Sequence, residues 1–220
     1  FNMGMMAALG VRYQINRITS VGLSLRSPLW HQFGFGHMTQ STLHTTDVGA
    51  PTPLLLLHED TLTVRTLPMR IGTGVAFCEP GRWAITADLV IYGPMEYTST
   101  ASIRRPDLNV VTRRRTVVNI AVGSEYYLTP AVPLRTGFFT DQSAAPTPGQ
   151  AAGDDQMDLY GWTLTVGRDT PRSSAQFGFV AVYAVGKVLG IDLASPQYAP
   201  VLASASEWRI SIVYSTSFAF

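Results

Sequence analysis

Apolar and polar residues alternate along most of this chain, most regularly between residues 206 and 220. From Trp208 onward the even positions carry aromatic, aliphatic or threonine side chains, and the odd positions carry mostly small or polar ones. A period of two is typical of an extended strand with one apolar face. The same alternation elsewhere predicts nine strands in an all-β chain, near residues 3–15, 18–27, 60–77, 82–93, 112–128, 134–142, 157–168, 175–188 and 206–220.

The connections between these strands alternate between tight turns and long loops. Short connections are expected at residues 16–17, 78–82, 129–133 and 169–174, and long ones at 28–60, 94–111, 143–156 and 189–205. Bacterial outer-membrane barrels have this arrangement, with turns in the periplasm and loops outside, and their strands need about 9–11 residues to cross the bilayer. We therefore predict one domain over residues 1–220, a transmembrane antiparallel up-and-down β-barrel of the bacterial outer membrane with a long extracellular segment at 28–60.

Composition favours lipid as the solvent of the apolar rows. Charged residues make up only 14% of the chain, and hydrophobic residues make up 46%. If the apolar rows were buried, the outer surface would carry too few charges for a soluble protein. Aromatic residues also gather near strand ends, as the interfacial girdles of barrels require. They are Trp83, Tyr126, Tyr160, Trp162, Trp208, Phe218 and Phe220. A secreted β-sandwich or lectin is the alternative fold.

Charge and cysteine content argue against several other functions. A net charge of +1 does not favour a nucleic-acid partner, and the single Cys78 excludes an internal disulfide or a cysteine-based zinc site. All four histidines lie within 28–60, where a metal cluster or a Ser-His-acid set is conceivable but lacks a recognisable spacing. They are His31, His37, His44 and His58. We expect no enzyme activity and no cofactor.

Several segments resemble the outer-membrane long-chain fatty acid and aromatic hydrocarbon transporter family, the FadL/TodX type. These are "SVGLSLRSP" at 20–28, "LPMRIGTGVAFCEPGRWAITADLVIYGP" at 67–94 and "PLRTGFFTDQSAAPTP" at 133–148, followed in order by "MDLYGWTLTVG" and the terminal strand. The last strand, which ends on an aromatic residue, resembles the signal that barrels present to their insertion machinery, and this implies a periplasmic C-terminus. The family's N-terminal hatch has no counterpart here, and nine is an odd number of strands where bacterial barrels have an even one. We therefore expect an N-terminally truncated barrel.

The resemblance implies passive transport of hydrophobic molecules, such as long-chain fatty acids, across the outer membrane. Alternation places several arginines on the polar face, where a guanidinium could hold a carboxylate, although bracing of the wall by charge pairs is the commoner role. Leucines 54–57 are expected in an exposed loop that captures apolar solutes, or in a strand that reaches the outer leaflet. The candidate ligand-binding residues are Arg26, Arg70, Arg135, Arg209, Phe139, Leu54, Leu55, Leu56 and Leu57.

Further partners follow from the expected location. These are the lipid of the outer membrane, the barrel insertion machinery, and the phosphates of lipopolysaccharide for the arginines at 113–115. Ordinary solvation of those arginines in a loop is equally compatible with the sequence. A barrel that only anchors a partner or has a structural role, or a general porin, is the alternative function.

Overall fold

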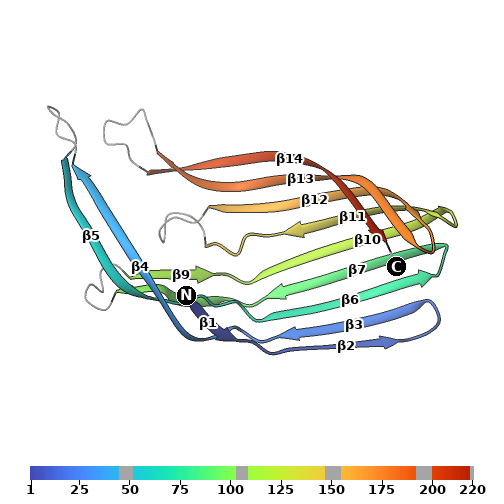
Figure 1. Ribbon diagram of the computed structural model, residues 1–220, viewed down its shortest axis with the longest axis horizontal. Helices are drawn as coiled ribbons and strands as arrows, with labels where there is room; N and C mark the ends of the chain where they lie inside the picture. Colours follow the sequence, from blue (N-terminus) through green and yellow to red (C-terminus); the bar gives the residue numbers. More distant parts are fainter. Residues whose placement is uncertain (45–51, 103–108, 147–154, 192–199, 219–220) are drawn as a thin grey trace. The chain divides into compact units, whose positions relative to one another are not determined.

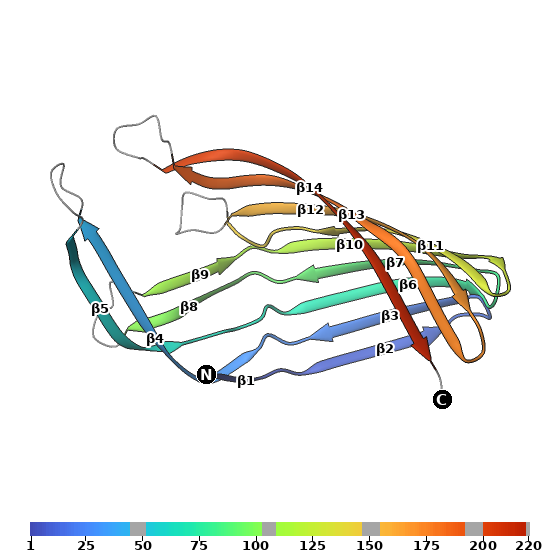
Figure 2. The same ribbon diagram turned by 45° about the horizontal axis from the view of Figure 1, so that its top comes forward.

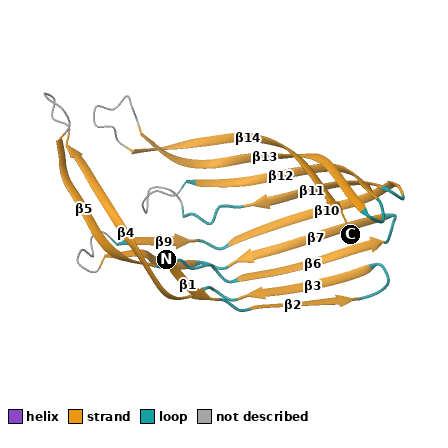
Figure 3. Ribbon diagram, viewed as in Figure 1, coloured by secondary structure: helices purple, strands orange, loops and turns teal. Residues whose placement is uncertain are grey.

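In the part of the chain that it describes, the computed structural model contains only strands, turns and loops (Figure 3). It describes residues 1–44, 52–102, 109–146, 155–191 and 200–218, and for residues 38–44, 52–60, 191 and 200 it describes the backbone alone. No helix in this described part is long and apolar enough to cross a membrane. The chain divides into two compact units, one of residues 1–7, 27–69 and 95–113 and one of residues 8–26, 70–94 and 114–220, and each is described separately below.

The larger unit is a nine-stranded antiparallel sheet (Figures 1 and 2). Its order is β14-β13-β12-β11-β10-β7-β6-β3-β2, so each strand pairs with the nearest members of the sheet along the chain. The strands are β2 (Ala8–Gln14), β3 (Thr19–Arg26), β6 (Arg70–Glu79), β7 (Trp83–Tyr92), β10 (Val117–Thr129), β11 (Val132–Asp141), β12 (Gln156–Asp169), β13 (Ser173–Ile191) and β14 (Pro200–Phe218). The predicted meander of nine strands is confirmed, and β2 and β14 form the two edges of this open sheet.

Tight turns join four pairs of these strands where the sequence predicted them. Residues 15–18, 80–82, 130–131 and 170–172 form the connections. At the second of them Gly81 has a φ of 73°, a left-handed conformation that side chains with a Cβ rarely adopt. In the first, the Asn16 side chain accepts hydrogen bonds from the backbone N–H groups of Ile18 and Thr19. The turn chemistry of these two connections therefore favours the register of their hairpins locally.

The smaller unit is a five-stranded sheet of order β1-β4-β5-β8-β9. Its strands are β1 (Asn2–Met5), β4 (Trp30–His44), β5 (Thr52–Thr63), β8 (Met95–Ser102) and β9 (Val110–Arg114). Each continues a strand of the larger sheet after a short interruption, at residues 6–7, 27–29, 64–69, 93–94 or 115–116. The long loops expected at 28–60 and 94–111 were therefore wrong, because β4, most of β5 and β8 occupy them, and the strand expected at 60–77 is interrupted before Arg70.

The register of the larger sheet separates a polar face from an apolar face. One row of directly opposed residues crosses all nine strands on the polar face: Arg12, Gly22, Gly74, Asp88, Ala121, Phe139, Gly161, Val182 and Arg209. The residues next to them along each strand form the apolar face. The alternation in sequence therefore predicted the faces correctly.

Apolar side chains remain uncovered on the apolar face. Ile210 and Ile212 are 74% and 75% exposed, and Ile85, Val118 and Ile120 are also exposed, while Trp83 and Leu89 are partly covered. Buried hydrophobic residues in the described part of the chain are limited to Val117, Ala145 and Ala184, with Pro133 fully buried. A sandwich would bury an apolar face between two sheets, so this arrangement excludes the sandwich alternative.

The edge strand β14 carries an aromatic residue near each limit of its apolar row. Trp208 and Phe218 are 63% and 68% exposed and lie ten residues apart. That separation is roughly 33 Å along a strand, or about 23 Å across a bilayer for a tilt of about 45°. This matches the apolar band of about 25 Å between the aromatic girdles of outer-membrane barrels. Phe220, the last residue of the expected terminal signal, lies outside the described residues.

Candidate solute-binding groove

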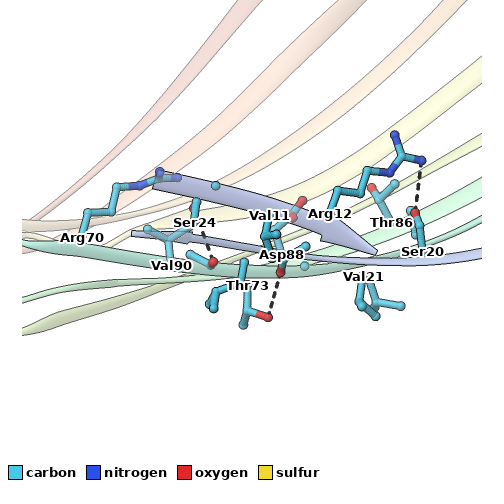
Figure 4. Close-up of a pocket in the computed structure, with 17 residues that line it drawn as sticks. Val11, Arg12, Ser20, Val21, Ser24, Arg70, Thr73, Thr86, Asp88 and Val90 are labelled. Atoms are coloured by element: carbon cyan, nitrogen blue, oxygen red, sulfur yellow. Dashed lines mark hydrogen bonds between the residues drawn. The ribbon is translucent and has the colours of Figure 1, made fainter. Parts of the chain in front are cut away.

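A groove of about 840 Å³ lies within the larger unit, where β2, β3, β6 and β7 run side by side (Figure 4). On the polar face it is lined by glycine and serine, with Arg12, Arg70 and Asp88 as its charged residues. Arg12 and Arg70 extend to one side of the sheet, and Val21 and Thr73 extend to the other (Figure 4). The volume lies within the range of small-molecule sites, which is about 300–1,000 Å³.

Glycines form the floor of the groove, where the Ser24 and Arg70 side chains lie over Gly72 and the Asp88 carboxylate lies over Gly74. Gly22 of β3 lies directly opposite Gly74 of β6, and Ser24 lies opposite Gly72. A methyl group on Gly22 would have the Val11 carbonyl oxygen, at 3.8 Å, as its closest neighbour, so the space above this glycine is open. A methyl group on Gly74 would instead collide with the Asp88 carboxylate. Asp88 therefore extends over Gly74, while the space above Gly22 stays open.

Charges of opposite sign stand at the two ends of the glycine row. Arg12 lies opposite Gly22, and Asp88 lies opposite Gly74. One Arg12 guanidinium nitrogen donates a hydrogen bond of 3.3 Å to the Ser20 hydroxyl. Asp88 makes no ion pair with any described residue. Both groups therefore remain available on the wall of the groove.

Arg26 and Arg70 form a second charged pair on the polar face, next to the pair of Ser24 and Gly72 along β3 and β6. They are directly opposed on neighbouring strands, and both belong to the polar face. The Arg26 Nε atom is buried and has no hydrogen-bond partner. Within the described part of the chain, no carboxylate lies within 4.0 Å of either guanidinium. Arg70 lines the groove, and Arg26 adjoins it through this pairing.

The other predicted arginines are neutralised by neighbouring acids. Arg135 donates from Nε to Glu125 at 2.5 Å and from Nη2 to Asp169 at 3.3 Å, in a partly buried cluster. Arg209 forms an exposed ion pair of 3.1 Å with Glu207. Alternation along the strands placed both arginines on the polar face, but the contact with Asp169 depends on the register between β11 and β12. No feature of the sequence indicates that Asp169 is a partner of Arg135, apart from its place at the end of a strand.

Phe139 lies over a glycine on the adjacent strand. It is directly opposite Gly161, and a methyl group on that glycine would collide with the phenyl ring. The ring therefore covers the backbone of β12 on the polar face, in the arrangement known to protect cross-strand glycines. This places an apolar ring on the polar face, at two strands' distance from the groove.

Of the remaining candidates, the leucines, the histidines and Arg113 belong to the smaller unit. Leucines 54–57 belong to β5, so they lie in a strand and the exposed-loop prediction was wrong, and their side chains lie outside the described residues. Among the described side chains no group of three or more potential metal ligands occurs, and those of His44 and His58 lie outside that part. In the arginine run at 113–115, Arg113 forms an ion pair with Glu96.

A short turn carries a polar cluster that the sequence did not predict. Arg82 donates to the Glu79 carboxylate at 2.8 Å, and the Trp83 indole N–H donates to the same carboxylate at 3.1 Å. The hydrogen bond from Arg82 is the main cause of a lowered pKa of Glu79. The sequence predicts only a turn at residues 78–82, "CEPGR", although an acid three residues before an arginine is also a usable signal for an ion pair. This cluster fixes the orientation of an aromatic residue at the edge of the apolar face.

Comparison with solved structures gives two similar folds. The toluene transporter TodX of Pseudomonas putida matches with a TM-score of 0.59 and 17% identity, over 100% of this chain and 50% of that one. The CymD monoaromatic hydrocarbon channel matches with a TM-score of 0.59 and 13% identity, over 98% of this chain and 51% of that one. No family model and no curated protein sequence matches. The chain therefore shares the antiparallel β fold of these two structures and spans about half of their length.

Proposed function

We propose that the protein is a passive outer-membrane channel for hydrophobic molecules, with long-chain fatty acids and aromatic hydrocarbons as the candidate solutes. The observation that carries the proposal is the glycine-lined groove on the polar face, which is open above Gly22, opposite a face of uncovered apolar side chains. If lipid covers the apolar face, the polar face lines the lumen and the groove lies on the solute's path. The two similar structures are described as a transporter and a channel, in agreement with our prediction that the chain is not an enzyme.

Within this proposal the candidate residues contribute unequally. Arg26 and Arg70 carry positive charge without a neighbouring acid, and they are the first candidates for a carboxylate. Phe139 supplies apolar wall. We keep Arg135 and Arg209 as lumen residues whose charge is already compensated. Leucines 54–57 remain proposed as an apolar contact for solute or lipid.

The proposed location implies an orientation and further partners. The tight turns and the C-terminus would face the periplasm, and the long connections would face outward toward lipopolysaccharide. Folding would require the barrel insertion machinery, because apolar side chains such as Ile210 and Ile212 are uncovered before lipid reaches them. Labelling of an introduced cysteine in the turn at 170–172, on intact and on permeabilised cells, tests this orientation.

A barrel that braces the membrane, anchors a partner or acts as a general porin is the second candidate. The observation that favours it is the pairing of Arg135 with Glu125 and Asp169, which is typical of charges that stabilise the wall of a barrel. Uptake of labelled toluene, labelled oleate and a small labelled sugar by cells with and without the whole protein distinguishes these functions. Faster uptake of toluene or oleate supports our proposal, faster uptake of the sugar alone indicates a porin, and no change for any of them indicates a structural barrel.

A further inference from the structure

A second cavity lies at the tight-turn end of the larger unit, beside the connection of residues 80–82. It measures about 340 Å³ and is bordered by that turn, by the start of β7 and by the end of β10. Trp83 of β7 lies directly opposite Tyr126 of β10, and both belong to the apolar face. Glu79 of β6 lies opposite Trp83 on its other side, so a carboxylate stands at the limit of that face. The solute-binding groove uses none of these residues.

The turn that carries Arg82 is fixed to β6 and to β10. The backbone N–H of Arg82 donates to the Glu79 carbonyl at 3.0 Å, and the Arg82 carbonyl accepts from the Tyr127 N–H at 2.9 Å. The Arg82 side chain donates to the Glu79 carboxylate, which also accepts the Trp83 indole N–H. The cation, the anion and the indole ring are therefore held together before any ligand arrives.

Both charged groups keep unused hydrogen-bonding capacity. The contact with Glu79 uses one guanidinium nitrogen of Arg82, and its Nε and Nη2 atoms have no hydrogen-bond partner among the described residues. A carboxylate offers about four lone-pair sites, and Glu79 accepts only the two hydrogen bonds above within the described part of the chain. The side chains of Arg82 and Glu79 are 72% and 41% exposed. Exposed ion pairs contribute little to stability, so a ligand can engage both groups at small cost.

This combination of groups defines the chemistry of the ligand. A guanidinium donates to phosphate oxygens in a fork. A carboxylate accepts hydrogen bonds from a primary ammonium, and the faces of aromatic rings attract the same cation. The carboxylate also disfavours a ligand that carries only negative charge. A phosphate and a primary ammonium joined by a short linker match this set, and they occur together in the headgroup of phosphatidylethanolamine.

We infer that this cavity binds the headgroup of a zwitterionic phospholipid that carries a primary ammonium. Arg82 holds the phosphate. The ammonium lies against Glu79 and the rings of Trp83 and Tyr126. Tryptophan and tyrosine suit this position, because both occur at the level of the headgroups in membrane proteins.

The apolar face continues from the two rings toward the middle of the sheet. Ile85 of β7 and Val122 of β10 are exposed on this face, so acyl chains attached to the headgroup can lie along them. In the proposed orientation the tight turns face the periplasm, and the bound lipid belongs to the periplasmic leaflet. The inference rests on the proposed location in a membrane and is independent of the solute.

The test measures which lipids the whole protein retains. Protein in detergent micelles is titrated with phosphatidylethanolamine, phosphatidylcholine and phosphatidylglycerol of identical acyl chains, and native mass spectrometry gives the amount of each bound lipid. We expect the wild-type protein to prefer phosphatidylethanolamine. Arg82→Gln should weaken this binding about tenfold, the effect of losing one charge-assisted contact. Glu79→Gln should abolish the preference over phosphatidylcholine, whose quaternary ammonium donates no hydrogen bond to the carboxylate.

Arg168→Gln is the matched control for charge. Arg168 is exposed on the same face near another tight turn, and it forms no ion pair with a described residue. This variant should keep the wild-type lipid preference. An equal loss in it would show that any arginine on this face attracts lipid, and the inference would fail. Because the readout is a ratio between lipids bound to folded protein, a loss of stability does not imitate the expected result.

Two further results would overturn the inference. One is equal retention of the three lipids by the wild-type protein, and the other is an unchanged preference in both Arg82→Gln and Glu79→Gln. Uptake of labelled toluene and oleate by cells separates this site from the proposed function. If uptake occurs while the lipid preference is absent, the inference fails and the proposed function stands. If the preference is present but wild-type cells take up neither solute, the proposed function fails and the headgroup site stands.

Discussion

Replacing Ile212 by lysine should lower the free energy of unfolding by more than an exposed substitution in water would, because the side chain would face lipid. Ile212 is 75% exposed on the apolar face of β14 and lies six residues before Phe218, the aromatic residue at one limit of the apolar row. Six residues span roughly 20 Å along the strand, or about 14 Å of depth at a tilt of about 45°. In a hydrocarbon core of about 30 Å this is near the midplane, where a lysine costs about 2–4 kcal/mol.

The adjacent residue supplies a matched control. Ser211 belongs to the same strand, is also exposed, and lies on the polar face opposite Val180. Ser211→Lys should change the unfolding free energy by less than about 0.5 kcal/mol, as exposed substitutions usually do. Denaturant titration of both variants in phospholipid vesicles, monitored by tryptophan fluorescence, measures the difference. Equal effects of the two substitutions would refute the assignment of lipid and lumen to the two faces.

Three further predictions concern the groove, the ion cluster and the turn. Gly22→Leu should lower uptake of the solute without loss of folded protein, since the space above this glycine is open. Gly190→Leu, also at an open site, is the control and should leave uptake unchanged. Equal uptake by the two variants would show that the groove is not on the solute's path. Arg135→Ala should lower the unfolding free energy by about 2 kcal/mol, because it leaves two partly buried carboxylates unpaired; an unchanged denaturation midpoint would contradict this. Glu79 has a pKa below its ordinary value of 4.5, so its small contribution to stability is present above pH 4.5 and is lost as the pH falls through the lowered pKa. Protonation of Glu79 should also change the fluorescence of Trp83, and Glu79→Gln should abolish this change. A fluorescence change that persists in the Gln variant would show that another group titrates.

The nine strands of the larger sheet were predictable because their apolar and polar residues alternate strictly. Strands such as β10 and β14 must present an apolar residue at nearly every second position, and tight turns interrupt them at defined places. The smaller sheet was missed because β4 carries glycine and histidine where a lipid-facing row would carry aliphatic residues. Prolines at 28, 68 and 94 also interrupt the pattern, and each lies in a segment between two strands.

For the candidate site, the alternation of residues along each strand predicted which face a side chain lies on and nothing more. Parity within each strand placed Arg26 and Arg70 on the same face as the glycines. It did not show that these two arginines are opposed, because opposition depends on the offset between β3 and β6. The same limit applies to Asp88, whose position over Gly74 follows from the offset between β6 and β7. Register between strands is a tertiary property that hydrophobic periodicity within one strand does not encode.

The stacking of Phe139 on Gly161 makes these two positions evolutionarily interdependent. A larger residue at 161 collides with the ring, so it is tolerated only after the ring has been lost, and loss of the ring alone uncovers the backbone of β12. The order in which substitutions arise therefore decides which sequences are accessible. A double-mutant cycle with Phe139→Ala and Gly161→Ala should show strong epistasis, the second substitution being far less harmful in the presence of the first. Divergent versions of this wall should then carry either the aromatic–glycine pair or two residues of intermediate size.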